Sequence, residues 1–339
     1  MENSSETQVG RADPDLLQRI CLDYICQNLD SICLRSTCPE SEIPEDETGP
    51  SKEIVMDLEI ALGQLHEKTN SKFSECEPLI PEKLEFLPDN DQLFLHSKLS
   101  EELLQRLSEL GTIDDIIFTL FDGSKTCLRR VKIDNASKLT RYGLQNLYNH
   151  NLKDLEVSNM VKATVNDLIQ CLNPWTLSNL KSLNVSNSTF VDNQKQTIVV
   201  ALTKLRNLSS LNVSGTEFNT TSLDMILEDL PMLESLDISN TKVRDISALV
   251  KAKDRLKSLS VADLKLSRTG SGNAHPAEDI EVLAQLQNLK HLDISECNDN
   301  QDESLFEATV SNSLNMSDFL VYCLKALPNL ISLDISGEN

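Results

Sequence analysis

The chain has 339 residues, of which 40% are hydrophobic, which is enough to bury a sizeable core and to form two domains. Its 53 acidic and 31 basic side chains give a formal net charge of −22, which argues against nucleic acid and anionic membrane surfaces as partners and favours basic ones. No run of about 18 apolar residues is present, so no membrane-spanning helix is expected.

The N-terminus is polar and acidic and lacks the basic and apolar regions of a signal peptide. Nine cysteines, an odd number, are scattered along the chain, a usage typical of reduced thiols. We therefore expect an intracellular protein in a reducing compartment, cytoplasmic or nuclear.

The first element expected after a disordered stretch over residues 1–12 is a helix within the segment 13–38. Asp13 and Pro14 open it, because aspartate caps a helix and proline suits its first turn. The apolar stripe of this helix, at helical spacing, consists of Leu16, Leu17, Ile20, Cys21, Tyr24 and Ile25.

An acidic linker is expected over residues 39–53, where prolines and five acidic residues precede Lys52. The segment 54–127 follows, with helices expected over 54–65 and from Ser100 to Leu110. Ser100 supplies a cap and the two glutamates after it favour the first turn of a helix.

From residue 128 onwards one phrase returns with small changes, as in Leu208-Ser-Ser-Leu-Asn-Val-Ser and Leu233-Glu-Ser-Leu-Asp-Ile-Ser. This is the L-x-x-L-x-L core of a leucine-rich repeat. Eight strands are expected to begin at Leu128, Leu152, Leu180, Leu208, Leu233, Leu256, Leu289 and Leu330. The first five gaps, of 23 to 28 residues, match the repeat length, and the last two, of 33 and 41, are expected to carry surface insertions.

Each repeat pairs one strand with one helix and buries its apolar face only by stacking on its neighbours. We therefore predict an α/β leucine-rich-repeat solenoid of about eight repeats over 128–339, with a parallel concave sheet and convex helices, preceded by a small α-helical region. Convex helices are expected over Val165–Leu172, Gln196–Leu205, Thr221–Leu230, Ala277–Leu286 and Met316–Leu327.

The residues that flank the strand leucines are expected to face the concavity. They are small, polar and acidic, and include no aromatic residue and no arginine, the usual anchors of an interface. Two interpretations remain open, a solvated strand face or a docking surface for a basic segment. The candidate contacts are Asp154, Glu156, Asp237, His291 and Asp293.

No motif for catalysis is found. Ten glycines form no phosphate loop, and neither G-x-S-x-G nor H-E-x-x-H occurs. The spacing of Cys21, Cys26, Cys33 and Cys38 matches no familiar zinc pattern, so we interpret them as core or interface thiols. We expect a noncatalytic protein without metal or cofactor.

Leu17, Cys21 and Ile25 lie four residues apart and share one face of the first expected helix. This L-x-x-x-C-x-x-x-aliphatic pattern resembles the elongin BC box, or VHL box, of cullin-RING ubiquitin ligase substrate receptors. The resemblance implies that Leu17 enters an apolar pocket of elongin C, that the small Cys21 permits close approach, and that Leu16, Ile20 and Ile25 add contacts.

The order of this helix, a spacer, a second helix and leucine-rich repeats is similar to the Zyg-eleven and Zyg-eleven-related (Zer) family of cullin-2 substrate receptors. Further matches are Leu233-Glu-Ser-Leu-Asp-Ile-Ser-Asn-Thr241 and the terminal Leu-Pro-Asn-Leu-Ile-Ser-Leu-Asp-Ile-Ser-Gly337. The resemblance implies binding to elongins B and C and to cullin-2 with its RING subunit. It also implies recruitment of substrate proteins for ubiquitination, in cell-cycle control.

Two segments compete for the cullin box implied by this resemblance. Ile80-Pro81-Glu-Lys-Leu84 keeps the proline of the family pattern, whereas the segment from Leu99 to Leu107 has Ser100 in its place but leads into the first repeat. We prefer the second. Its expected cullin-binding residues are Leu99, Ser100, Leu103 and Leu107.

Members of the family continue into armadillo-like repeats implicated in substrate binding, and this sequence ends just after a strand. It is therefore expected either to be a fragment or to have another element over its last repeat. A rival hypothesis is a free-standing leucine-rich-repeat scaffold or inhibitor that binds a basic protein. In that case the first helix would cap the solenoid, and Leu17 and Cys21 would be buried within the chain.

Overall fold

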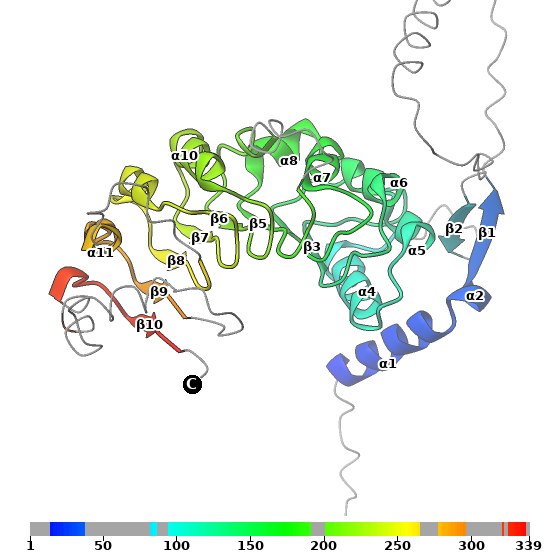
Figure 1. Ribbon diagram of the computed structural model, residues 1–339. Helices are drawn as coiled ribbons and strands as arrows, with labels where there is room; N and C mark the ends of the chain where they lie inside the picture. The colour runs from blue at the N-terminus through cyan, green and yellow to red at the C-terminus, as the bar shows by residue number, and fades with distance from the viewer. Residues whose placement is uncertain are drawn as a thin grey trace, which may run out of the picture.

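The computed structural model describes residues 14–37, 82–86, 94–190, 201–264, 277–295, 321 and 325–336. The repeats form an arc with strands along its inner side and helices along its outer side, and a small N-terminal part lies at one end (Figure 1). The predicted linker, the predicted helix over 54–65 and most of the two predicted insertions lie outside the described residues.

All eight predicted repeat strands are confirmed. They form one parallel sheet in which each strand pairs with the next in the sequence, and the leucines stand in register, as Leu183 does with Leu155 and Leu211. The strands are β3 (Arg130–Ile133), β4 (Asp154–Val157), β5 (Ser182–Asn184), β6 (Ser210–Asn212), β7 (Ser235–Asp237), β8 (Ser258–Ser260), β9 (His291–Asp293) and β10 (Ser332–Asp334). The fold is thus a leucine-rich-repeat solenoid.

The convex side carries short helices, several of which begin at polar caps. Thr164 and Asp167 form a capping box, and the side chain of Asn219 accepts a hydrogen bond from the amide of Ser222 at 2.9 Å. The elements are α5 (Asp115–Phe118), η2 (Thr119–Phe121), α6 (Arg141–Leu144), η3 (Gln145–Asn149), α7 (Val165–Gln170), α8 (Pro174–Asn179), α10 (Thr220–Asp229), η4 (Ser247–Ala252) and α11 (Ala277–Ala284). Of the five predicted convex helices, those over 196–205 and 316–327 lie largely outside the described residues.

The core lies between the sheet and these helices. Strand leucines such as Leu183, Leu211 and Leu236 are at most 1% exposed, and Phe190 packs on Phe218 in the next repeat with ring centroids 6.2 Å apart. Each repeat therefore buries its apolar side against both neighbours, as the repeat pattern predicts.

The end of the repeated phrase encodes a turn. The side chain of Asn184 accepts a hydrogen bond from the amide of Ser186 at 3.0 Å, and the equivalent bond recurs in later repeats. The residue after this serine takes a left-handed conformation, with φ of 51° at Asn187, 65° at Gly215 and 50° at Asn240. Asparagine and glycine suit this position, because they tolerate positive φ better than other residues.

Helix α4 (Ser97–Glu109) covers the open edge of the sheet at β3. The side chains of Ser100, Glu101 and Ser108 accept hydrogen bonds from backbone amides at or next to β3, at 3.1–3.2 Å. The helix begins three residues earlier than predicted, with His96 as its cap residue. Ser100 therefore does not cap the helix. Its hydroxyl is buried and accepts a hydrogen bond from the backbone just before the edge strand β3.

The N-terminal part contains α1 (Pro14–Gln27), α2 (Leu29–Ile32), β1 (Cys33–Thr37) and β2 (Glu82–Phe86). The two strands pair antiparallel, and β2 contacts α5 and η2 of the solenoid. Both strands fall in segments that were expected to be helical, so the N-terminal part combines the expected helices with a strand pair.

Candidate protein-docking sites

Helix α1 has two unlike sides. Cys26 is buried, and Leu22 and Ile25 are half-buried on the side that meets the core and α4. Ile20 and Tyr24 are 56% and 62% exposed on the other side. A soluble helix normally turns its large apolar residues toward a core, so the outer side has the composition of a docking surface.

The residues expected to bind elongin C are divided between these sides. Cys21 and Ile20 are exposed on the outer side, and Ile25 lies toward the inner side. The backbone of Leu16 and Leu17 lies in α1, but their side chains are outside the described residues. We define the outer face of α1 as Ile20, Cys21 and Tyr24.

Polar contacts hold α1 against α4. The amide of Gln18 donates to the carboxylate of Glu102, and the guanidinium of Arg106 donates to Asp23 at 2.5 Å and to Glu109 at 2.9 Å. The two carboxylates raise the pKa of Arg106, and the guanidinium lowers the pKa of Glu109. These contacts fix how α1 is oriented on the solenoid and therefore which side it presents.

The residues expected to bind a cullin are mostly buried. Ser100, Leu103 and Leu107 are at most 1% exposed and Leu99 is half-buried, because α4 uses this side to pack on the first repeat. In the competing segment, Leu84 is buried in β2, and Ile80 and Pro81 lie outside the described residues. Burial leaves Ser100, Leu103 and Leu107 no surface for a partner, which corrects the expectation that they form a contact.

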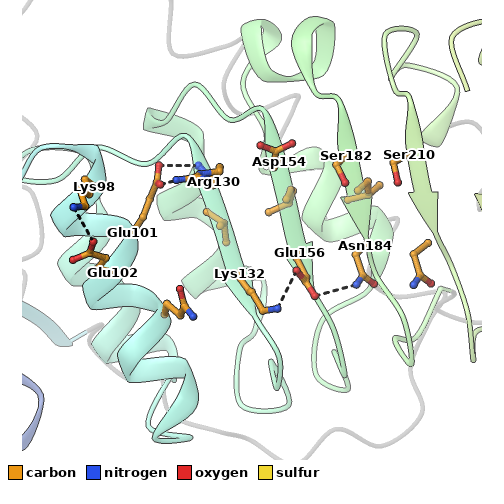
Figure 2. A pocket seen from close by; sticks show the side chains of 15 residues that line it. Lys98, Glu101, Glu102, Arg130, Lys132, Asp154, Glu156, Ser182, Asn184 and Ser210 are labelled. Atoms are coloured by element: carbon orange, nitrogen blue, oxygen red, sulfur yellow. Dashed lines mark hydrogen bonds and ion pairs between the residues drawn. The ribbon is translucent and has the colours of Figure 1, made fainter. Parts of the chain in front are cut away.

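The concave face is hollowed next to α4. The hollow has a volume of about 620 Å³ and is lined by α4 and by β3 to β6 (Figure 2). Its wall and first strand carry Lys98, Arg130 and Lys132, and its second strand carries Asp154 and Glu156. The sequence predicted the acidic groups Asp154 and Glu156 on the concave face but not the cations, which lie on the first strand and on α4.

The other predicted concave residues lie farther along the sheet, on β7 and β9. The carboxylates of Asp237 and Asp293 accept hydrogen bonds from the amides of Ser239 and Ser295, at 3.0 and 2.9 Å. His291 is exposed at the start of β9. The five candidates therefore do not form one site, and two of the carboxylates serve the turns of the repeats.

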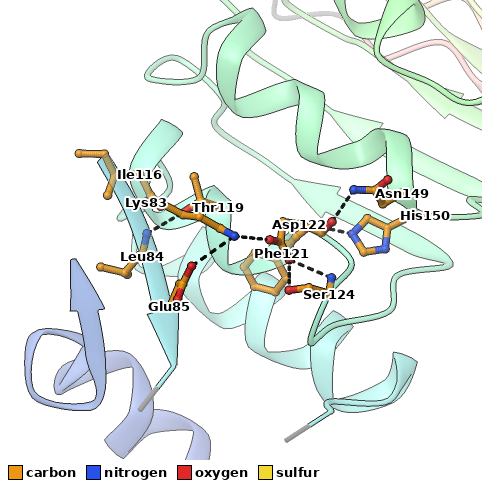
Figure 3. A network of polar contacts seen from close by, with 10 residues as sticks. All are labelled: Lys83, Leu84, Glu85, Ile116, Thr119, Phe121, Asp122, Ser124, Asn149 and His150. Atoms are coloured by element: carbon orange, nitrogen blue, oxygen red, sulfur yellow. Dashed lines mark hydrogen bonds and ion pairs between the residues drawn. The ribbon is translucent and has the colours of Figure 1, made fainter. Parts of the chain in front are cut away.

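A polar network joins the N-terminal strands to the first repeat (Figure 3). Lys83 of β2 forms an ion pair with Asp122 at 2.7 Å, and the amide of Leu84 donates to Thr119 at 2.9 Å. The buried ring of His150 bonds to the carbonyl of Phe121 at 2.6 Å. The network thus fixes β2, and β1 with it, to the solenoid.

Two of the buried cysteines, Cys26 and Cys171, have raised pKa values. Burial raises the pKa of Cys26 to about 11 and also raises that of Cys171, which disfavours the reactive thiolate. No group of three or more metal-ligating side chains is present in the part of the chain that the structure describes. Within that part, no helix is long and apolar enough to span a membrane.

Comparison with known proteins finds a similarity over the later repeats. Residues 226–339 match a family model described as Zer-1-like leucine-rich repeats. The proteins named protein zer-1 homolog from Homo sapiens and Pongo abelii are each 31% identical to this chain over 116 residues. That alignment covers 34% of this chain and 13% of each relative, so the chain spans only a small part of the curated relatives it matches.

Solved structures are similar to this chain at low sequence identity. A complex of Rad7 and Elc1 in yeast has a chain with a TM-score of 0.49 and 17% identity, covering 85% of this chain and 74% of that one. Internalin C2 from Listeria monocytogenes gives a TM-score of 0.37 and 20% identity, covering 62% of this chain and 74% of that one. Over residues 226–339, the repeats of this chain are thus similar to Zer-1-like leucine-rich repeats.

Proposed function

We propose that the protein is a noncatalytic substrate-receptor subunit of a cullin-2 RING ubiquitin ligase and that it docks on elongin C through the outer face of α1. The observation that carries this proposal is the exposure of Ile20, Cys21 and Tyr24 on a helix whose opposite side is anchored to α4. The Zer-1-related repeats support the choice of ligase family.

The chemistry of the outer face suits an apolar groove. Burying a large apolar side chain contributes about 1.5–3 kcal/mol, and tyrosine is frequent among the residues that dominate interfaces. Cys21 lies beside Ile20 and Tyr24 on this face, and its small side chain lets a partner helix come close. Because α1 is already fixed to α4, docking does not have to order it.

The rival scaffold hypothesis predicts that α1 buries Cys21 within the chain. Cys21 is exposed, and the buried cysteine of α1 is Cys26, on the other side of the helix. This arrangement favours the ligase proposal over a helix that only caps the solenoid, a role that α4 fills.

A cullin contact must then come from side chains that α4 does not bury. Phe94 and Leu110, at the two ends of α4, are exposed and apolar. We place the cullin contact on these ends. In this assignment one side of α4 packs on the first repeat, and the residues at its two ends contact the cullin.

Co-purification with elongins B and C tests the docking proposal. The double variant Leu17→Ala, Cys21→Phe should lose the elongins, because phenylalanine at 21 blocks close approach. A matched control is Val161→Ala, which truncates an exposed apolar residue of the second repeat and should retain them. Retention of the elongins by the double variant, with its thermal unfolding unchanged, would show that α1 is not the docking element.

Hydrogen exchange over residues 14–37 adds a second test. Elongins B and C should slow exchange in α1 and leave the amides of β4 to β7 unchanged. Protection confined to the repeats would instead favour the scaffold hypothesis.

A further inference from the structure

The hollow beside α4 has an ordered floor. Adjacent strands are in parallel register, so its side chains form two rows across the sheet. The first row is Arg130, Asp154, Ser182 and Ser210, and the second row is Lys132, Glu156, Asn184 and Asn212. Each row passes from a cation on β3 to an anion on β4 and then to small neutral groups on β5 and β6 (Figure 2).

Most charges in the hollow already have a partner. Arg130 pairs with Glu101 at 3.1 Å, Lys132 with Glu156 at 3.6 Å, and Lys98 with Glu102 at 3.7 Å. The amide of Asn184 also donates to Glu156 at 3.2 Å. These pairs neutralise all three cations of the hollow, so an anionic ligand would have to compete with three carboxylates already in place.

Asp154 differs from the other carboxylates of the hollow. It has no ion pair and no side-chain hydrogen bond with any described residue. Its neighbours in the row are Arg130, whose guanidinium is paired with Glu101, and the small Ser182. Figure 2 shows Asp154 next to Arg130 in the first row, with the pair formed by Lys132 and Glu156 in the second row. The fourth carboxylate of the hollow is thus left to interact with something outside the chain.

Asn212 offers a second unused group, two strands away. Its Oδ1 accepts hydrogen bonds from the amide and hydroxyl of Ser214, at 2.9 and 2.8 Å. Its Nδ2 donates to no described residue, and Asn212 is one of the residues that line the hollow. The side chain is therefore held in place by one atom and free to donate with the other.

We propose that this hollow binds an extended basic segment of a partner protein, with a lysine or arginine side chain on Asp154 and a main-chain carbonyl on Nδ2 of Asn212. Two strand spacings of about 4.8 Å and two residues along the strand direction separate these residues, and an extended peptide covers the resulting ~12 Å in about four residues. The serines of β5 and β6 leave room for a main chain between the two anchors. The net charge of −22 also steers a basic partner toward the chain.

The test uses the whole chain and a defined probe, the hexapeptide acetyl-Gly-Ser-Arg-Ser-Gly-Ser-amide, in isothermal titration at low salt. Asp154→Asn should weaken binding at least about 10-fold, the loss expected for one charge-assisted hydrogen bond. Asp254→Asn removes the same charge from an exposed site on another repeat and should leave binding unchanged. The same peptide with glutamate in place of arginine should not bind.

A second variant fills the hollow without removing its carboxylate. Ser182→Lys places an ammonium group in the row beside Asp154 and should abolish peptide binding. Equal weakening by Asp154→Asn and Asp254→Asn would overturn the proposal, because it would trace binding to the overall charge. The proposal would also be overturned if no saturable binding were seen up to about 1 mM peptide, or if the chain preferred the glutamate peptide.

The inference does not depend on the ligase proposal. Peptide binding is measured without elongins, and Leu17→Ala, Cys21→Phe should not affect it. Asp154→Asn should in turn leave elongin co-purification intact. Each proposal can therefore be refuted without affecting the other.

Discussion

Replacing His150 with threonine tests how the first repeat is joined to the N-terminal part. His150 is 2% exposed, its Nδ1 accepts a hydrogen bond from the amide of Leu128 at 3.2 Å, and its Nε2 bonds to the carbonyl of Phe121 at 2.6 Å. Because Nδ1 is an acceptor, the proton of the neutral ring lies on Nε2 and is donated to Phe121. A second proton would remove the acceptor that Leu128 needs.

The sign of the pH effect follows from this geometry. Burial lowers the pKa of His150, and this outweighs the Phe121 carbonyl and the Asp122 carboxylate, which raise it. The unfolded chain binds the proton at about pH 6.5, whereas the folded chain binds it only at lower pH. The neutral ring therefore contributes stability above about pH 6.5, and this is lost as pH falls toward the folded pKa, by at most about 1.4 kcal/mol per pH unit.

The next repeat shows which replacement to choose. There the hydroxyl of Thr176 accepts from the amide of Leu152 at 3.0 Å, the same role that His150 has for Leu128. In His150→Thr the threonine should keep this acceptor but lose the bond to Phe121, at a cost of about 1–3 kcal/mol at pH 7.5. Between pH 7.5 and 5.5, the variant should lose up to about 1.4 kcal/mol less stability than the wild type.

Urea unfolding followed by circular dichroism at pH 7.5, 6.5 and 5.5 measures both quantities. His291→Ser removes an exposed histidine of the concave face and should keep the pH dependence of the wild type. The reasoning is refuted if His150→Thr keeps that dependence too. It is also refuted if His291→Ser reduces the dependence as much.

Two further predictions concern single buried groups. Thr176→Val preserves shape but leaves the buried amide of Leu152 without its acceptor, and should lower the free energy of unfolding by about 1–3 kcal/mol more than Thr189→Val in urea titrations. The hydroxyl of Thr189 bonds to no described residue, so similar losses would contradict the role of Thr176. Iodoacetamide at pH 8 should modify the exposed Cys21 long before Cys26, because burial raises the pKa of the Cys26 thiol to about 11. Mass spectrometry measures the two modification rates. Comparable rates would show that α1 does not pack on α4 as described.

The repeats were predictable because their period is a packing requirement. A leucine in register with the leucines of both neighbouring strands, as at Leu211, can lie only between the sheet and the helices. The Asn or Asp directly after this leucine was a candidate contact on the concave face. The structure shows that Asp237 and Asp293 also close the turn after the strand, a local role that the residue type alone does not separate from binding.

The N-terminal part was predictable only in outline. The helix from residue 14 follows from its cap and its stripe, but the pairing of β1 with β2 joins segments far apart in the chain, and no local pattern fixes such a pair. The apolar stripe of α4 caused a different difficulty. An amphipathic helix has the same pattern whether it packs on its own domain or on a partner, so Leu103 and Leu107 could not be assigned to the core from the sequence.

Helix α4 links the two proposed sites. Glu102 lines the hollow and also accepts the bond from Gln18 of α1, and Glu101 holds Arg130 on the floor of the hollow. The 13 residues of α4 span about 20 Å, and its buried side is fixed to β3 along that length. A peptide on Asp154 and a partner on the outer face of α1 would therefore be held at a set distance by one rigid helix. Such a fixed distance is what a receptor requires if it is to present a bound protein to a ligase.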